Sequence, residues 1–402
     1  MSKQAERVKF HPINEEAALF PKPMVPVLPV LSANSLFGGG TQSYRSRFFE
    51  GDALPVRRGR IGIVMALQAM GTGPGSAVLV PAYHCRSMIE PILWLGATVR
   101  FYKLKPNLEI DLEDVRHKLE RSTKALLLVH FFGFPQPLAL VRTLCSEHGI
   151  ALIEDCAHAF FGESEGSPLG SVGDFSIASM PKFFPAVDGG ILCPASRITG
   201  TLHSSGLFGQ VKAAYEMVGL ATRYNRLQVL GAMAGLAATI RQVLRSERAT
   251  VTAAGSEPNI PSVDELMQCF NPEEIGLRAT HASRLVTCWS GKAKNAERRR
   301  MHYRYLSEKL SGLPRTELVF PVLPPGVIPY MFPILLKAPA RDFAPLKRLR
   351  VPIWRWEEIA YSECLVSQDY RMRLLQIPCH QGLCQSELDW MIARFREVLD
   401  SH

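Results

Sequence analysis

Between Gly59 and Pro194, short apolar runs alternate with segments of helical periodicity. Three of the apolar runs read AVLVPAY, KALLLVHFF and IALIEDC, and all are rich in Val, Ile and Leu. Strands that alternate with helices of about 10 to 15 residues form a parallel sheet with helices on both faces. The chain is therefore predicted to be an α/β protein whose large domain has a mostly parallel sheet flanked by helices.

Glycines and prolines between these segments set the expected order of elements. Helices are expected at 59–71, 87–95, 111–120 and 138–149, and strands at 77–83, 96–104, 124–133, 150–159, 173–180 and 189–194. In sheets of this kind, ligands bind outside the carboxyl ends of the strands. Candidate site residues are therefore sought where these strands end.

The rhythm of the sequence changes outside this region and divides the chain into four parts. Residues 1–45 are rich in proline and read as an extended N-terminal arm, and residues 46–200 form the large domain. Residues 201–265 look helical and irregular and are interpreted as an insertion. Residues 266–402, which include a long basic helix from Gly291, are expected to form a smaller C-terminal α+β domain.

Composition excludes several classes of protein. A chain of 402 residues with 47% hydrophobic and 21% charged residues is typical of a globular protein. The formal net charge of +9 favours acidic partners such as phosphorylated small molecules. The basic residues are scattered, which argues against nucleic-acid binding. The apolar stretch at 227–240 is shorter than the about 20 residues that span a bilayer, so a membrane role is not favoured.

The nine cysteines have irregular spacing and include no CxxC pair. This pattern predicts neither a metal site nor a disulfide framework. The first residues, MSKQAERVKFHPINEE, contain no apolar core of the kind that a secretory signal needs. We expect a protein of the reducing cytoplasm.

Three features lie where successive elements of the predicted sheet end or begin. Asp155 ends the run IALIED, His158 follows three residues later, and Lys182 comes after the next apolar run. The third feature is the start of a helix at Gly59, where free backbone N–H groups can bind a phosphate. A buried lysine has a lowered pKa and becomes an amine nucleophile.

Pyridoxal phosphate chemistry needs such a set, because it uses a lysine that condenses with an aldehyde and an aspartate that faces the pyridinium nitrogen. A plain alternative stays open at this point. Asp155 can serve as a helix cap or an ion-pair partner, and Lys182 can be a solvated loop residue.

The segment GIALIEDCAHAFFGESEGSPLGSVGDFSIASMPKFFPAVDGG resembles the matching stretch of the DegT/DnrJ/EryC1/StrS aminotransferase family. The upstream segments GTGPGSAVLVPAYHC and LLVHFFGFPQPL resemble the same family in the same order. The resemblance covers about 59–194 well, and is poor between about 200 and 265. It implies a fold type I enzyme dependent on pyridoxal phosphate.

The resemblance also assigns roles by position. Lys182 matches the family's Schiff-base lysine, and Asp155 matches the aspartate that faces the pyridine nitrogen. His158 lies where the family has Gln or His near the phenolic oxygen of the cofactor. Ser179 matches the serine that contacts the phosphate.

Two cofactor-binding positions depart from the family pattern. Relatives carry Gly-Thr-Ser at the phosphate-binding helix start, whereas this chain has Gly59, Arg60 and Ile61. Arg60 can bind phosphate as a bidentate fork or point into solvent. Relatives also place a ring-stacking aromatic where this chain has Cys85, so Tyr83 or His84 is expected to take that role, or the ring packs on a smaller group.

Two further positions are candidates for substrate binding. His130 ends the run LLLVH near the predicted cleft. Arg355, between Trp354 and Trp356, is a candidate for the rim that meets an acidic or ring portion of the substrate. Ordinary packing of the smaller domain explains this second group equally well.

The implied activity is transfer of an amino group from a small-molecule donor, glutamate or glutamine, to a keto or aldehyde acceptor such as a nucleotide-linked keto-sugar. The resemblance also implies a homodimer. A lyase or dehydratase on the same scaffold is the alternative, and a regulatory protein with a vestigial site is a third hypothesis.

Overall fold

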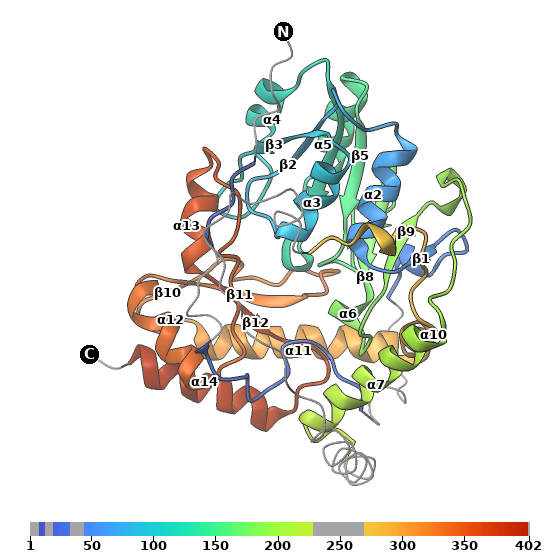
Figure 1. The fold of residues 1–402 in the computed structure, drawn as a ribbon. Helices are drawn as coiled ribbons and strands as arrows, with labels where there is room; N and C mark the ends of the chain where they lie inside the picture. Colours follow the sequence, from blue (N-terminus) through green and yellow to red (C-terminus); the bar gives the residue numbers. More distant parts are fainter. Residues whose placement is uncertain (1–7, 13–18, 33–43, 228–268, 401–402) are drawn as a thin grey trace, which may run out of the picture.

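The computed structural model of the protein describes residues 8–12, 19–32, 44–227 and 269–400. They are organised around a seven-stranded sheet with the strand order β1-β9-β8-β5-β4-β2-β3 (Figure 1). The strands are β1 (Leu54–Val56), β2 (Ala77–Pro81), β3 (Thr98–Tyr102), β4 (Thr123–Val129), β5 (Ala151–Asp155), β8 (Phe175–Ser179) and β9 (Gly190–Cys193). A small hairpin, β6 (Glu163–Ser164) and β7 (Ser167–Pro168), precedes β8.

Five neighbouring strands of the large sheet, β3, β2, β4, β5 and β8, run parallel. β9 pairs antiparallel with β8, and β1 completes the sheet by pairing antiparallel with β9. All of β2 and residues 125–129 of β4 are buried, because helices cover both faces of the sheet. The sequence therefore shows unbroken apolar runs instead of alternation. The predicted α/β class with a mostly parallel sheet is confirmed.

Helices link and cover these strands. They are α2 (Gly59–Ala69), α3 (Arg86–Trp94), α4 (Leu112–Lys118) and α5 (Leu138–Glu147), and a short helix, α6 (Met180–Phe183), follows β8. Residues 61–67 of α2 are all buried, because this helix packs on β8 and β9 on one side and on α3 on the other. All four longer helices lie within a residue or a few residues of their predicted limits.

The start of α2 passes β9 at very close range. A Cβ atom on Gly190 would overlap the amide nitrogen of Gly59 and the carbonyl carbon of Arg58. Only glycine fits at this point, because the contact is between two backbones that cannot move aside independently. Gly190 therefore sets the distance between the sheet and the first turn of α2.

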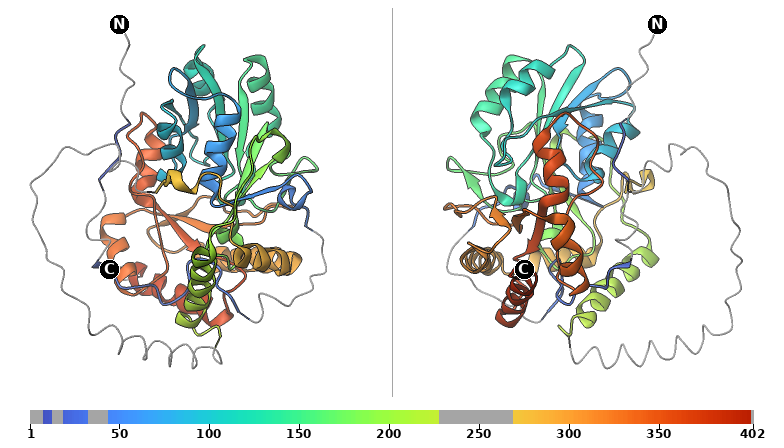
Figure 2. Two further views of the ribbon diagram at one scale, coloured as in Figure 1. Left: turned by 45° about the vertical axis from the view of Figure 1, so that its right-hand side comes forward. Right: turned by 90° about the vertical axis from the view of Figure 1, so that its left-hand side faces the viewer.

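A smaller α+β unit follows, as the sequence predicts. Its antiparallel sheet has the order β10-β11-β12. The elements are β10 (Thr316–Leu318), β11 (Met331–Leu336), β12 (Leu374–Pro378), α11 (Lys292–Leu310), α12 (Pro339–Arg348), α13 (Leu365–Arg373) and α14 (Gln385–Leu399). Figures 1 and 2 show α11 and α14 together beneath this sheet, and α11 contacts β11.

The segments that flank the two units contact both of them. α10 (His281–Trp289) packs on α7 (Leu207–Arg223), and the Leu277 carbonyl accepts a hydrogen bond from the Arg57 amide of the large unit. The described parts of the N-terminal arm pack on the C-terminal unit of their own chain, where Phe10 pairs with Ala360. α7 occupies part of the predicted insertion, and the remainder, with the apolar stretch at 227–240, lies almost entirely outside the described residues.

Within the described ranges, no helix combines the length and the apolar character that crossing a bilayer requires.

We expect Gly190→Ala to lower the free energy of unfolding by about 1–3 kcal/mol, because the added methyl group forces backbone shifts in a packed region. Gly219→Ala on α7 is the matched control, since a Cβ there meets nothing within 4 Å. Urea unfolding of both variants measures the difference. Equal stability of the two variants would contradict the proposed backbone contact.

Candidate functional site

A cavity of about 170 Å³ lies at the carboxyl ends of β5 and β8, where α2 and α3 begin. Its walls include seven of the predicted site residues: Gly59, Arg60, Cys85, Asp155, His158, Ser179 and Lys182. They come from four places in the sequence that the parallel sheet brings together. The cavity lies where open α/β sheets bind ligands.

Lys182 enters the cavity from α6, the single helical turn that follows β8. Its ammonium nitrogen lies 5.3 Å from the centre of the Tyr330 ring. Burial lowers the pKa of the Lys182 amine, an effect that Cys85 and Asp155 oppose and that the charge of Arg60 increases. A neutral amine is thus more accessible here than on a solvated lysine.

Asp155 is the last residue of β5 and is 5% exposed. Its Oδ1 accepts a hydrogen bond of 2.8 Å from the Ala157 amide, which fixes the orientation of the carboxyl group. Burial raises the pKa of this carboxyl, and Lys182 partly offsets the effect. The group is therefore a buried acid that is best stabilised as an anion when a cation binds in the cavity.

His158 is buried among aromatic rings, with Tyr330 stacked at 4.4 Å and Trp356 at 5.6 Å between centroids. Burial lowers the pKa of this imidazole well below its usual value, and Lys182 adds to the effect. The Phe132 amide donates to Nδ1 at 3.4 Å. In the neutral ring the proton then sits on Nε2, which can donate to an oxygen of a ligand.

A further part of the cavity wall is formed by the first turn of α2 together with Ser179 and Gly189. The amides of Gly59 and Arg60 belong to the first turn, which has no intrahelical acceptors for them. A phosphate group is bound well at such a helix start. Ser179, the last residue of β8, adds a hydroxyl group to the same wall.

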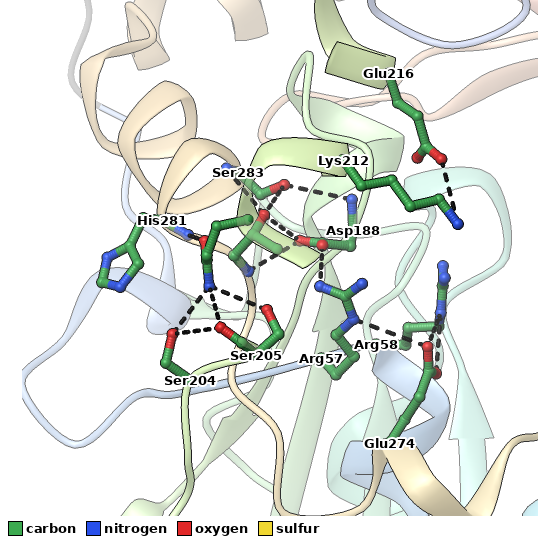
Figure 3. Close-up of polar contacts among 12 residues, drawn as sticks. Arg57, Arg58, Asp188, Ser204, Ser205, Lys212, Glu216, Glu274, His281 and Ser283 are labelled. Atoms are coloured by element: carbon green, nitrogen blue, oxygen red, sulfur yellow. Dashed lines mark hydrogen bonds and ion pairs between the residues drawn. The ribbon is translucent and has the colours of Figure 1, made fainter. Parts of the chain in front are cut away.

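Three arginines surround this helix start, and acidic residues neutralise two of them (Figure 3). Arg57 pairs with Asp188, and Arg58 donates to both carboxylate oxygens of Glu274 at 3.0 Å. Arg60 donates instead to the carbonyl oxygen of Cys269. Among the described residues, no carboxylate forms an ion pair with Arg60, so its positive charge is available to an anion in the cavity.

Asp188 has a second role beside its pairing with Arg57. Its Oδ1 accepts from the amide and the hydroxyl of Thr280 at 3.1 and 3.0 Å, and Ser283 lies next to it in Figure 3. This buried network ties the segment before β9 to the start of α10. Asp188 therefore holds the glycine pair 189–190 in place beside α2.

Five predicted residues lie outside the cavity lining, and two of them are the candidates for stacking on a cofactor ring. Tyr83 is fully buried against Trp356, with the two ring centroids 4.9 Å apart. His84 is also fully buried, stacks on Phe101 and accepts a hydrogen bond from the Ala360 amide. Both side chains point into the packing between the two units. Of the three alternatives for the face of the cofactor ring, this placement favours the smaller group, because Cys85 lines the cavity.

Ile61 differs from its two neighbours at the helix start. Its side chain is fully buried and does not line the cavity, while its amide donates to the Arg58 carbonyl. Ile61 therefore contributes packing that anchors α2 to the sheet, not a contact with a ligand.

His130 belongs to a buried structural network behind the cavity. Its Nε2 lies 3.1 Å from Glu154, whose oxygens also accept from the amides of Gly170, Val172 and Gly173. Cys156 lies close to both side chains, so the three offer a possible metal cluster. The Glu154 oxygens already accept hydrogen bonds from the loop before β8, so we interpret the three residues as a support for this loop. His130 points into this network and not into the cavity, which does not favour the expected substrate role.

Arg355 also points away from the cavity. It donates to Glu357 at 2.7 Å and lies over the Phe343 ring at 3.5 Å. Its neighbour Trp356 lines the cavity instead, so the rim predicted for this segment is aromatic at the cavity and not cationic.

Two further residues at or beside the site, Asp188 and Tyr330, were missed in the sequence analysis. Asp188 could have been suspected from its position before a glycine pair, but Tyr330 follows no motif. Its position depends on long-range contacts between the two units, which a local pattern does not encode.

We expect Asp155→Asn to raise the melting temperature of the ligand-free protein at neutral pH. The raised pKa of Asp155 means that the folded protein holds a proton longer than the unfolded chain. Stability therefore falls as pH rises through this range and stays lower above it. The amide removes this penalty and keeps the contact with Ala157, so the gain should vanish below about pH 4.

Asp114→Asn is the matched control, because Asp114 accepts from the Lys103 amide at 2.7 Å and pairs with Lys118 at 2.9 Å. Loss of the negative charge that pairs with Lys118 should lower the melting temperature of the Asp114→Asn variant. Thermal unfolding at several pH values measures both effects. A lower melting temperature for Asp155→Asn at neutral pH would contradict the assignment of Asp155 as an uncompensated buried acid.

Comparison with solved structures shows the fold of this chain in several aminotransferases. The aminotransferase TlmJ from Streptoalloteichus hindustanus superposes with a TM-score of 0.59 and 22% identity, over 87% of this chain and 86% of that one. Helicobacter pylori PseC, an aminotransferase involved in the biosynthesis of pseudoaminic acid, gives a TM-score of 0.64 and 14% identity, over 95% and 100% of the two chains.

Sequence relatives match a shorter part of the chain. The GDP-perosamine synthase of Vibrio cholerae is 33% identical over 149 residues, which are 36% of this chain and 41% of the relative. The L-glutamine:2-deoxy-scyllo-inosose aminotransferase of Streptomyces kanamyceticus is 30% identical over 130 residues, 32% and 30% of the two chains. The aligned part thus spans less than half the length of these relatives.

The sequence model of one family matches residues 50–253, about half of the chain. The match extends into the segment at 201–265 as far as residue 253. It also contains every residue from the large unit that lines the cavity. The chain belongs to the DegT/DnrJ/EryC1/StrS aminotransferase family.

Proposed function

We propose that this protein is a pyridoxal-phosphate-dependent aminotransferase that transfers the amino group of an amino acid to a keto or aldehyde acceptor. One observation carries the proposal: Lys182 and Asp155 face the same buried cavity, beside a helix start that suits a phosphate. The membership of the chain in an aminotransferase family supports it.

The groups that line the cavity fit the cofactor in charge and in hydrogen bonding. The first turn of α2, Ser179 and Arg60 would hold the phosphate. Asp155 would pair with the protonated ring nitrogen, which would remove the cost of its buried charge, and the Nε2–H group of His158 would donate to a ring oxygen. When bound, the cofactor supplies an electron sink that stabilises negative charge at the carbon next to the amine.

Lys182 has two tasks in this account. Its neutral amine is the nucleophile that attaches the cofactor, and burial favours that form. With a donor bound, the free Nζ would take a proton from the α-carbon of the donor and pass it to the cofactor; in the second half-reaction it would take this proton back and deliver it to the acceptor carbon that receives the amine. A base with a lowered pKa suits this transfer near neutral pH.

The other cavity residues orient the reacting groups and exclude water. Asp155 stays fixed by the Ala157 amide, so its negative charge is directed into the cavity. His158 is held between Tyr330 and Phe132 and cannot rotate freely. Trp356, from the smaller unit, lines the cavity next to these groups and limits the access of solvent.

Relatives suggest the substrate classes. Their names include a GDP-perosamine synthase, a UDP-N-acetyl-3-dehydro-α-D-glucosamine 3-aminotransferase and an L-glutamine-dependent aminotransferase. We propose glutamate or glutamine as the donor and a keto-sugar, free or nucleotide-linked, as the acceptor. All nine cysteines are free thiols, which supports a place in the reducing cytoplasm.

We further propose that the protein acts as a homodimer. Apolar side chains are exposed on two helices that contact each other: Leu207 and Phe208 on α7 and Trp289 on α10 are 82%, 83% and 64% exposed. Large apolar side chains exposed on two contacting helices favour an interaction site here. A second copy of the chain would cover it.

Replacing Lys182 by Ala should abolish covalent attachment of the cofactor and reduce amino-group transfer by at least about 10²–10⁴-fold, because the nucleophile and the proton-transfer base are both lost. Wild-type protein loaded with pyridoxal phosphate should be yellow. After borohydride reduction, peptide mapping should find the label on the peptide that contains MPKFF. Lys292→Ala, on α11, is the matched control and should keep the label. A labelled lysine elsewhere in the Lys182→Ala variant would refute the assignment.

Phe208→Asp should shift the protein from dimer to monomer in light scattering, since a carboxylate replaces a large apolar side chain in the proposed interface. Leu140→Asp serves as the control, because Leu140 is 61% exposed but lies on α5. A wild-type protein that is monomeric, or a Phe208→Asp variant that stays dimeric, would contradict the proposed interface.

A further inference from the structure

Arg299, on α11, is a completely buried arginine that lies behind the cavity. Its guanidinium group makes four hydrogen bonds, all to uncharged oxygens. Nε donates to the side chain of Gln381 at 2.8 Å, and one terminal nitrogen donates to the carbonyls of Pro329 and Tyr330 at 3.1 Å each. The other terminal nitrogen donates to the carbonyl of Lys182 at 2.8 Å.

Among the described arginines, Arg299 is the one that is completely buried. Arg57, Arg58 and Arg226 all bind carboxylates, as buried or half-buried arginines usually do. Arg299 forms no ion pair with a described carboxylate, and burial lowers the pKa of its guanidinium to about 10, which leaves it charged at neutral pH. A buried charge without a counterion is costly, so a simple packing role is a poor explanation for this residue.

The four hydrogen bonds connect three segments that are distant in the sequence. They reach the lysine turn α6, the residues that enter β11, and the loop after β12. Gln381 extends the connection, because its Nε2 donates to the Phe183 carbonyl at 2.8 Å. The backbone on both sides of the Lys182–Phe183 peptide bond is thus held from the smaller unit.

The same fork also sets the position of the ring above the lysine. Tyr330, whose carbonyl accepts from Arg299, places its ring 5.3 Å from the Lys182 ammonium nitrogen and stacks on His158. The guanidinium itself lies over the Phe183 ring at 4.4 Å. One rigid, planar group therefore fixes the lysine backbone and the aromatic ring that limits the movement of its side chain.

We propose that Arg299 is a positioning residue that fixes the amine of Lys182 relative to Asp155. In this position the Lys182 amine can bind the cofactor and transfer the proton. The inference rests on the proposed function. Arg299 does not line the cavity, so it would act through the lysine turn and not by contact with substrate or cofactor. The planar fork is essential to this role, since an ammonium group cannot direct donors to Gln381, Lys182 and Tyr330 at once.

The test compares Arg299→Lys with Arg298→Lys in protein loaded with pyridoxal phosphate. Both variants keep the positive charge, and Arg298 also donates to a carbonyl of the loop after β12, that of Leu383 at 2.8 Å, but not to the lysine turn. Three quantities are measured: the pH midpoint of the visible absorbance change, the rate of the first half-reaction with glutamate, and the melting temperature.

In Arg299→Lys we expect a pH midpoint that differs from that of the wild type and a half-reaction that is slower by about 10²-fold, the usual cost of a misplacement of about 1 Å. Arg298→Lys should match the wild type in both. If Arg299→Lys is less stable but has the wild-type midpoint and rate, Arg299 is only structural and the proposal is refuted.

Gln381→Met carries the same test if Arg299→Lys does not yield folded protein, because it removes an acceptor of Arg299 and the donor to Phe183. Unchanged midpoint and rate in that variant would refute the proposal as well. Failure of the proposed function looks different, since wild-type protein freed of unbound pyridoxal phosphate would then show no visible absorbance, or no half-reaction with an amino acid.

Discussion

The site depends on the parallel pairing of β5 with β8. In this register Asp155 lies opposite Ile177, so the chain leaves both strands at the same edge of the sheet. Asp155 is the last residue of its strand, and Lys182 follows β8 by a single turn of helix. A carboxylate and an amine that are far apart in the sequence thus face one cavity, and each alters the pKa of the other.

The smaller unit completes what the sheet begins. The large unit supplies the groups with chemistry, whereas Trp356 and Tyr330 supply the rings that enclose them. Burial by these rings favours the neutral forms of the lysine and the imidazole. Arg299 holds the lysine turn from the same side. The cavity therefore needs residues of both units, whereas the family match, at residues 50–253, covers the large unit and not the smaller one.

Much of the large unit could be predicted from the sequence, because its buried strands read as unbroken apolar runs with polar residues at their ends. The places of Lys182 and Asp155 near the ends of strands could be predicted in this way. The direction of each side chain could not be predicted, because neighbouring residues of a strand point to opposite faces and an error of one residue exchanges the two faces. Asp155 faces the cavity while Glu154 turns to His130. The directions of Tyr83, His84 and Arg355 could not be predicted either, because contacts between distant segments set them.

The most direct test of the account is a single half-reaction without an acceptor. Protein loaded with pyridoxal phosphate is mixed with glutamate or glutamine labelled with ¹⁵N at the α-amino group, and the keto acid and the label are both measured. We expect one molecule of keto acid for each subunit, with the ¹⁵N retained on the protein-bound cofactor. Continued release of labelled ammonia, or no keto acid with either donor or any other amino acid, would contradict transamination by this protein.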